Sequence, residues 1–285
     1  MTVDLQETVR RCELLLKEHD IATLKALVEC VGDEVDVQFA DRPDLPTIPI
    51  EPTSSDISAK NRTAHYLLLA ASIDIGRIVG EAENARRTLS MMHSLTGDRL
   101  FEEIDENTVA SWFSNIEPNF RLGPQRRDIP YYICKVNSFI RRLGGDLYHW
   151  GRRYSKPVDI INEIANKCDL GKPESARKRV CMFLRWMVRP KPDLRIWDHL
   201  SPRDLYLPLD KNVGFVLYRL GIIGESGSDN PNWNHVKVTT DFAKNIYPED
   251  PVKVDYPFFL VGRWLRGKAS VKKHCEHIAR KLFVL

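Results

Sequence analysis

Apolar residues recur at helical spacing along nearly the whole chain. Val9, Cys12 and Leu15 mark a first helix, and the stretch ATLKALVECV forms a second. A proline-rich stretch over residues 36–56 reads as a loop with room for a short extended piece at its start. Sustained alternation of apolar and polar residues, the pattern of a strand, is absent outside residues 35–39. The pattern therefore predicts an all-α fold.

After the loop, residues 61–80 are apolar on most sides, which predicts a central helix. The stretch IPYYICKVNSFIRRLGG predicts a helix that stops at Gly144, and PVDIINEIANKC predicts one with Pro157 in its first turn. The short break DLGK separates this helix from the next, which ends near Val188 and has Pro173 at its start. Residues 157–188 are thus expected to form a helical hairpin.

Composition narrows the class of protein. The chain has 285 residues, 43% of them hydrophobic, and no apolar run reaches the roughly 18 residues that a membrane span needs. The start of the chain lacks the apolar core of a signal peptide, so we expect a soluble protein of the cytoplasm without a membrane partner.

Cysteine and histidine give no metal motif. The six cysteines contain no C-x-x-C pair, which argues against a disulfide framework, a zinc finger or an iron–sulfur cluster. His274, Cys275 and His277 lack a matching second cluster and lie in a cationic tail that would repel a cation. We therefore expect no metal.

Positive charge is concentrated in one stretch. Residues 121–195 hold 18 Lys plus Arg against 7 Asp plus Glu, a net charge of +11, within a chain whose total is +3. Such a field favours binding of a polyanion such as a nucleic acid. Lysine and arginine side chains displace the counterions from its phosphates, and the release of these counterions favours binding. The alternative is a set of solvated helix faces with no binding role.

Three adjacent cations, Arg177, Lys178 and Arg179, open an otherwise apolar helix. Lys178 shares a face with Cys181 and Met182, so it lies at the border of the apolar stripe. Burial, the neighbouring guanidinium groups and the positive end of a helix all lower the pKa expected for this lysine. A free amine at this position could act as a nucleophile. The alternative is a lysine that extends to solvent and contacts phosphate or water.

Two carboxylates are expected at helix starts further along the chain. Asp210, in the stretch PLDKNV, directly precedes a helix with an apolar face. Pro257 requires the last helix to begin close to Asp255, with Phe259 just beyond. A carboxylate at a helix start is rigidly directed, although capping alone would also explain it.

The hairpin with Lys178, the stretch PLDKNV and the stretch VDYPFFLVGR together resemble the helix-hairpin-helix DNA glycosylases. They are most similar to the archaeal 8-oxoguanine DNA glycosylases and a related prokaryotic family, over roughly residues 170–265. The resemblance implies a helix-hairpin-helix glycosylase fold, in which two helical subdomains flank a DNA-binding groove. The whole chain, 1–285, would form one glycosylase unit, with the hairpin at about 157–188 and an N-terminal extension at about 1–55.

The resemblance also implies roles for individual residues. Lys178 corresponds to the nucleophile and Asp210 to the carboxylate that assists it. Lys172, Arg177 and Arg179 would hold DNA phosphates that flank the damaged nucleotide, which positions the duplex without reading its sequence.

Four residues are implied for the base pocket. Asp255 is similar to a residue that contacts the extruded base, and Phe259 is the aromatic that follows it. Met182 stands where an aromatic face for stacking is expected. Asn84 is the candidate for base reading in the N-terminal third, where the family's glutamine has no clear counterpart.

The implied activity is base-excision repair. The enzyme would flip out an oxidised purine, with 8-oxoguanine favoured, remove it through a lysine Schiff base and cleave the strand at the abasic site. It would need no cofactor, and its partner would be double-stranded DNA with a damaged base, bound by a monomer associated with the nucleoid. One alternative is an abasic-site lyase or a glycosylase for another lesion. The alternative from another class is a helix-hairpin-helix protein that binds DNA without catalysis.

Overall fold

The chain is described by a computed structural model over residues 5–18, 20–32, 55–74, 84–116, 128–190 and 192–267. Within these ranges the regular structure is helical, and the only β-type pairing is an isolated bridge between Ser175 and Asn232. The all-α prediction is therefore confirmed. None of the helices in the described ranges has the length and apolar character required to cross a membrane.

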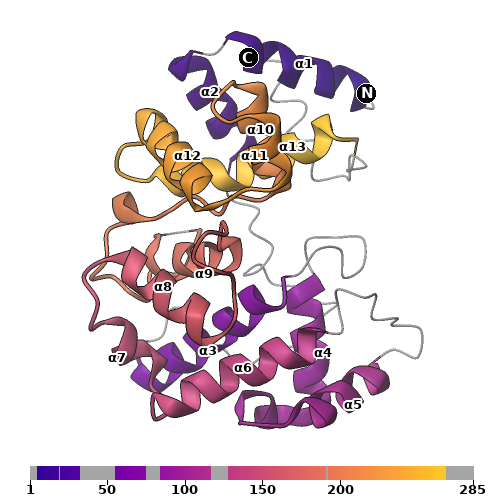
Figure 1. Cartoon of the computed structure of the whole chain (residues 1–285), viewed down its shortest axis with the longest axis vertical. Helices are drawn as coiled ribbons and strands as arrows, with labels where there is room; N and C mark the ends of the chain where they lie inside the picture. The colour runs from indigo at the N-terminus through magenta and orange to yellow at the C-terminus, as the bar shows by residue number, and fades with distance from the viewer. Residues whose placement is uncertain are drawn as a thin grey trace. The chain divides into compact units, whose positions relative to one another are not determined.

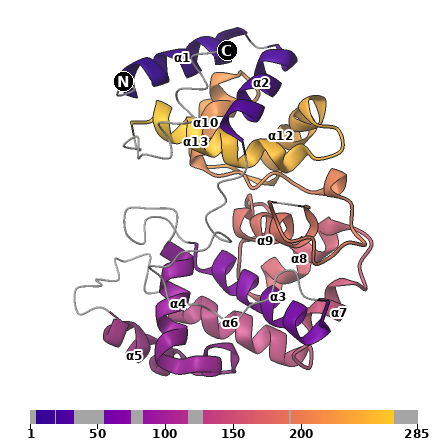
Figure 2. The same ribbon diagram turned by 180° about the vertical axis from the view of Figure 1, so that it is seen from behind.

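The chain divides into two compact units, drawn from opposite sides in Figure 1 and Figure 2. Unit 1 comprises residues 1–35, 173–178 and 202–285, and unit 2 comprises residues 36–172 and 179–201. The chain thus begins in unit 1, forms most of unit 2, returns to unit 1 for residues 173–178, re-enters unit 2 for residues 179–201 and ends in unit 1.

Unit 1 joins helices from the two ends of the chain. In Figure 1 its N-terminal helices are indigo and its C-terminal helices are orange to yellow. The helices are α1 (Leu5–Glu18), α2 (Ile21–Val31), α10 (Lys211–Arg219), α11 (Glu225–Asp229), α12 (Trp233–Ile246) and α13 (Asp255–Leu265), with 3-10 turns η3 (Pro202–Asp204) and η4 (Pro251–Val254).

The N-terminal helices are part of the core of unit 1. Leu15 of α1 and Leu27 of α2 lie in one buried cluster with Val216 of α10 and Phe258 of α13. At the edge of this cluster, Glu29 accepts hydrogen bonds from Tyr247 Oη at 2.7 Å and Lys253 Nζ at 2.8 Å. Removing α1 and α2 would therefore expose a large part of the apolar surface of this unit.

Helices α10 and α13 cross with their backbones in close contact. A Cβ atom at Gly262 of α13 would lie 2.2 Å from the backbone oxygen of Asn212 in α10. Arg266, just after α13, donates a hydrogen bond from Nη1 to the backbone oxygen of Lys211 at 2.7 Å. Glycine at 262 thus allows the crossing, and the arginine holds the first turn of α10 against the end of α13.

Gly262→Ala is therefore expected to destabilise the protein. The added methyl meets a backbone atom, so one of the two helices must move, and overpacking of this kind typically costs about 1–3 kcal/mol. Urea denaturation monitored by circular dichroism would measure the loss of unfolding free energy. Gly224→Ala is the matched control, since a Cβ at Gly224 would have no neighbour within 4 Å. Equal midpoints for the two variants would contradict the close crossing.

Unit 2 is formed by the central part of the chain. Its core contains a group of edge-to-face aromatic rings, in which Trp150 contacts Phe139 and Trp197 contacts Phe183. Its helices are α3 (Ile57–Ser72), α4 (Asn84–Thr96), α5 (Glu106–Ile116), α6 (Asp128–Arg142), α7 (Leu147–Gly151), α8 (Pro157–Lys167) and all of α9 (Lys178–Val188) after its first residue, with a 3-10 turn η1 (Gly97–Phe101).

The predicted hairpin corresponds to α8 and α9, and two of its details are informative. Pro157 is at the start of α8, as predicted. The prediction for Pro173 is wrong, because α9 begins at Lys178 and residues 173–177 form a turn and an extended segment. Arg177 has a φ of 47°, a left-handed conformation that a helix cannot contain. The helix therefore starts one residue later, at the lysine.

The predicted central helix is shorter than expected. Helix α3 ends at Ser72, whose hydroxyl donates to the backbone oxygen of Leu69 at 2.8 Å. Asp74 lies beyond the helix, and its N–H donates to Ala71 O at 3.3 Å in a turn. Apolar residues continue past this point, so the apolar pattern alone could not place the end. The remainder of the predicted helix, residues 75–80, lies outside the described residues.

Candidate functional site

Lys178 is placed by a loop that is anchored to α12. The N–H of Trp233 donates to the backbone oxygen of Glu174 at 2.8 Å, and Ser175 forms the bridge with Asn232. The guanidinium carbon of Arg177 lies 5.4 Å from the centre of the Trp233 ring, within cation–π range. Lys178 follows directly, as the half-buried first residue of α9. Its backbone position is therefore set by contacts within unit 1.

Asp210 is the N-cap of α10. Its Oδ1 accepts hydrogen bonds from the N–H groups of Asn212 at 2.7 Å and Val213 at 2.9 Å, so the predicted capping is confirmed. Its Oδ2 has one long contact, 3.5 Å from Asn212 Nδ2. The two oxygens therefore have different surroundings. One satisfies the helix start, and the other is held at a defined position with capacity for a further partner.

Asp255 begins α13, as the position of Pro257 predicted. Its residue is 7% exposed, which is unusual for a carboxylate. Phe259 lies one turn later, half-buried, with its ring 6.4 Å from that of Tyr256 in a stacked orientation. The guanidinium carbon of Arg263 lies 5.7 Å from the Phe259 ring centre. Helix α13 thus presents a carboxylate and two aromatic rings in its first half and a cation in its last turn.

The predicted residues are divided between the units. Lys178, Asp210, Asp255 and Phe259 belong to unit 1, as does Arg177. The others belong to unit 2, and they are Lys172, Arg179, Met182 and Asn84.

Within unit 2 these residues differ in exposure. Lys172 is exposed in the loop between α8 and α9, whereas Met182 is buried with 9% of its surface exposed. Asn84 is the first residue of α4, and its side chain lies outside the described part of the chain.

Several cations of the basic stretch already have structural partners. Arg179 donates to the backbone oxygen of Ser72 at 2.7 Å, and its guanidinium carbon lies 4.2 Å from the centre of the Tyr132 ring. Arg152 pairs with Asp198 at 2.5 Å. The net charge of +11 therefore overstates the charge that this stretch offers to a partner. The phosphate-binding role of Arg177 and Arg179 remains a prediction.

A buried ionic cluster, which the sequence analysis missed, closes the end of α9. Asp193 Oδ2 lies 3.2 Å from both Arg185 Nε and Arg189 Nη1, and all three side chains are at most 5% exposed. The segment after α9 folds back, so that Trp197 N–H donates to Met187 O at 2.7 Å. The sequence signal for this cluster is a pair of arginines four residues apart on an apolar helix, followed shortly afterwards by Pro192 and Asp193. Arg185 and Arg189 therefore have a structural role, because a buried carboxylate such as that of Asp193 requires charged partners.

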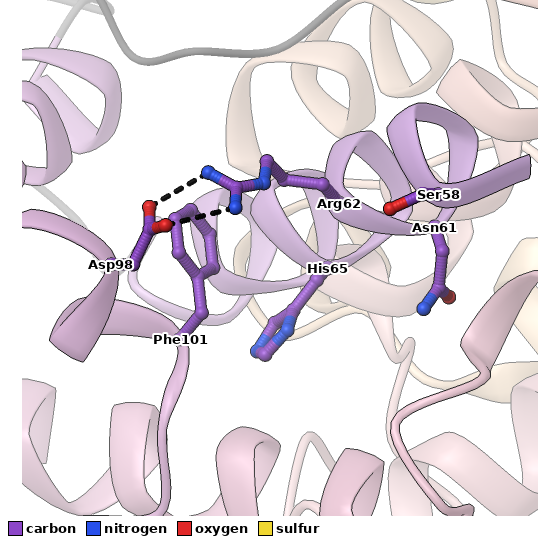
Figure 3. Close-up of a pocket in the computed structure, with 6 residues that line it drawn as sticks. All are labelled: Ser58, Asn61, Arg62, His65, Asp98 and Phe101. Atoms are coloured by element: carbon purple, nitrogen blue, oxygen red, sulfur yellow. Dashed lines mark hydrogen bonds and ion pairs between the residues drawn. The ribbon is translucent and has the colours of Figure 1, made fainter. Parts of the chain in front are cut away.

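A small pocket lies on unit 2, shown in Figure 3, and contains none of the predicted site residues. Arg62 makes a two-fold hydrogen bond to Asp98, at 2.7 and 3.0 Å, beside the ring of Phe101. The guanidinium carbon of Arg62 lies 5.7 Å from the centre of that ring. The lining residues are Ser58, Asn61, Arg62, His65, Asp98 and Phe101.

His65 in this pocket is a neutral histidine with an assigned tautomer. Asn137 uses its Nδ2 to donate to the backbone oxygens of Leu100 and Glu102, at 3.0 and 2.6 Å. Its Oδ1 must therefore accept the 2.7 Å hydrogen bond from His65, which places the proton on Nε2. Burial, with a smaller contribution from the Arg62 cation, lowers the pKa of His65 from 6.5 to about 4.

This histidine makes stability depend on pH. The unfolded chain binds a proton at His65 below about pH 6.5, and the folded chain binds it only near pH 4. Unfolding free energy should therefore fall as pH decreases from 6.5 to 4, by on the order of 3 kcal/mol from this residue. His65→Gln retains an amide donor without titrating. Urea denaturation across this pH range should show that unfolding free energy falls more steeply with decreasing pH for the wild type than for His65→Gln. The same dependence on pH in both proteins would contradict a buried, neutral His65.

The described residues define an all-α protein of two units, and unit 1 holds Lys178, Asp210 and Asp255, each at the start of a helix. A family model described as a protein of unknown function (DUF2400) matches residues 58–263, and the chain belongs to this family. The match contains Lys178, Asp210, Asp255 and Phe259. Comparison with curated proteins and with solved structures gave no match.

Proposed function

We propose that the protein is a base-excision DNA repair enzyme that removes an oxidised purine through Lys178 and then cleaves the strand. The observation that carries the proposal is the placement of Lys178 and Asp210 in one compact unit, each at the start of a helix. A protein that only binds DNA has no need for a lysine at the border of a core or for a carboxylate held at a defined position. The resemblance over roughly residues 170–265 supports the same chemistry.

The proposed reaction begins with attack by the neutral amine of Lys178 on C1′ of the damaged nucleotide. The bond between C1′ and Nζ forms as the bond between C1′ and the base breaks, and the base leaves with a proton. The sugar ring then opens, which gives a Schiff base between Lys178 and C1′. Loss of a proton from C2′ expels the 3′ phosphate, and water then releases the lysine.

Asp210 has two tasks in this scheme. Its carboxylate stabilises the positive charge that develops on the sugar as the base leaves, and it accepts and returns the protons that are transferred. Because Oδ1 is occupied by the backbone of α10, Oδ2 is the oxygen assigned to the reaction. The helix that this residue caps therefore also orients it.

Residues of α13 are assigned to the extruded base. A base inside a duplex is out of reach of the lysine, so it must be flipped out at an unstacking cost of a few kcal/mol. Asp255 would accept hydrogen bonds from the edge of the base, and the half-buried ring of Phe259 would contact its face. An oxidised purine offers an additional N–H, which a carboxylate can recognise.

Borohydride trapping with a panel of duplexes tests this proposal. Duplexes with 8-oxoguanine, other lesions, an abasic site or no lesion would each be incubated with the full chain and sodium borohydride, and covalent complexes separated by denaturing electrophoresis. We expect trapping and strand cleavage on 8-oxoguanine and abasic DNA and none on undamaged DNA. Trapping on abasic DNA alone would indicate an abasic-site lyase without glycosylase activity. Binding without trapping on any duplex would contradict the proposed enzyme activity and indicate a protein that binds DNA without catalysis.

A further inference from the structure

One face of α10 carries cations and an aromatic ring in a line that starts beside Asp210. Lys211, Phe215 and Arg219 are four residues apart, so they share a face of the helix. Lys211 and Arg219 are exposed and Phe215 is half-buried. From Lys211 to Arg219 the helix rises by about 12 Å.

Arg266, from the end of α13, joins this line. Its guanidinium carbon lies 5.8 Å from the centre of the Phe215 ring, and that of Arg219 lies 6.0 Å from the same centre. The hydrogen bond from Arg266 to the backbone of Lys211 fixes its position. One ring thus holds two guanidinium groups, which reduces the freedom that each would lose on binding a ligand.

The charge of this cluster is not balanced by its contacts. Glu13 of α1 pairs with Arg219 at 3.5 Å, through side chains that are both about one-third exposed. Three cations and one carboxylate leave a net charge of +2. Exposed ion pairs are weak, so Arg219 can exchange this carboxylate for a more strongly charged partner.

We propose that Lys211, Arg219 and Arg266, organised by Phe215, bind the phosphate backbone of a DNA strand. Guanidinium groups bind phosphate oxygens through two parallel N–H donors, and an arginine held by a ring presents this fork in a constant orientation. A length of about 12 Å spans between three and four base-pair steps along the duplex axis, at 3.4 Å per step, so the cations can reach successive phosphates of one strand. This site rests on the proposed function for its ligand, but it does not require chemistry at Lys178.

The dependence of DNA affinity on salt tests this site. Each phosphate contact contributes about 0.9 to the slope of log affinity against log salt concentration. For an undamaged duplex, Arg219→Gln should lower the slope by about 0.9 and Arg219→Gln with Arg266→Gln by about 1.8. The single variant removes an exposed ion pair and a contact with the Phe215 ring but leaves the hydrogen bond from Arg266 to α10 in place, so it keeps the test valid if loss of Arg266 disturbs α10.

Lys237→Gln with Lys244→Gln is the matched control, because it removes the same charge from α12 of the same unit. An unchanged slope in both arginine variants, or an equal fall in the control, would overturn the site. Failure of the wild type to bind duplex at low salt would remove this proposal and the proposed function together. A third outcome separates the two proposals. If the wild type binds duplex and the arginine variants lower the slope, but borohydride traps no complex, the phosphate-binding site is supported and the proposed enzyme activity is contradicted.

Discussion

Replacement of Lys178 by glutamine is expected to abolish both the borohydride-trapped complex and strand cleavage. Glutamine has no nucleophilic amine, so neither the covalent bond to C1′ nor the Schiff base can form. Lys178 is half-buried at the first position of α9, where glutamine is accommodated at little cost to the helix. Circular dichroism should therefore show an unchanged helical content, while denaturing electrophoresis shows no covalent complex.

Two further variants separate a nucleophile from a phosphate contact. Lys178→Arg retains a cation that can bind phosphate, but its guanidinium stays protonated, so trapping should be lost while affinity for DNA is retained. Lys167→Gln removes an exposed lysine from the end of α8 and should trap as the wild type does. Trapping by Lys178→Arg at the rate of the wild type would assign the lysine to phosphate binding alone.

Asp210→Asn is expected to reduce the rate on the order of a hundredfold or more, with a stability change of about 1 kcal/mol or less. Asparagine is as good an N-cap as aspartate, since its side-chain oxygen can accept the bonds from Asn212 and Val213. It carries no charge, so it can neither stabilise a cationic sugar nor accept a proton. Single-turnover cleavage and urea denaturation would measure the two effects separately.

The control for this variant is Asp204→Asn, an exposed aspartate in the turn η3 of the same unit. It removes the same charge without a cap or a proposed role, so both rate and stability should match the wild type. If Asp210→Asn unfolds the protein, or if it cleaves at the rate of the wild type, Asp210 is a structural cap and takes no part in the reaction.

Helix starts were predicted well where a residue type determines them. Pro157, Asp210 and Pro257 each restrict the backbone or satisfy its N–H groups locally, so their effect does not depend on distant contacts. Pro173 failed because a proline only permits a helix start. The turn that follows is instead held by Trp233, far away in sequence. Contacts over such a separation leave no local pattern.

Partners of charged residues were the least predictable part of the site. Arg177 and Arg179 appear in the sequence as free cations, but the fold places one beside Trp233 and the other on the backbone of Ser72. The sequence also could not predict how the candidate residues divide between the two units. Only the six residues 173–178 belong to unit 1 in this part of the chain, and the residues on either side belong to unit 2. The line of cations on α10 is visible in sequence, whereas the contribution of Arg266 is not.

Identification of the trapped residue tests the central claim most directly. The full chain would be reduced with borohydride on an abasic or 8-oxoguanine duplex, digested with nuclease and protease, and the sugar adduct located by peptide mass spectrometry. The account predicts a single modified peptide, with the adduct on Nζ of Lys178. An adduct on another lysine, or on the amino terminus, with Lys178 unmodified would contradict it.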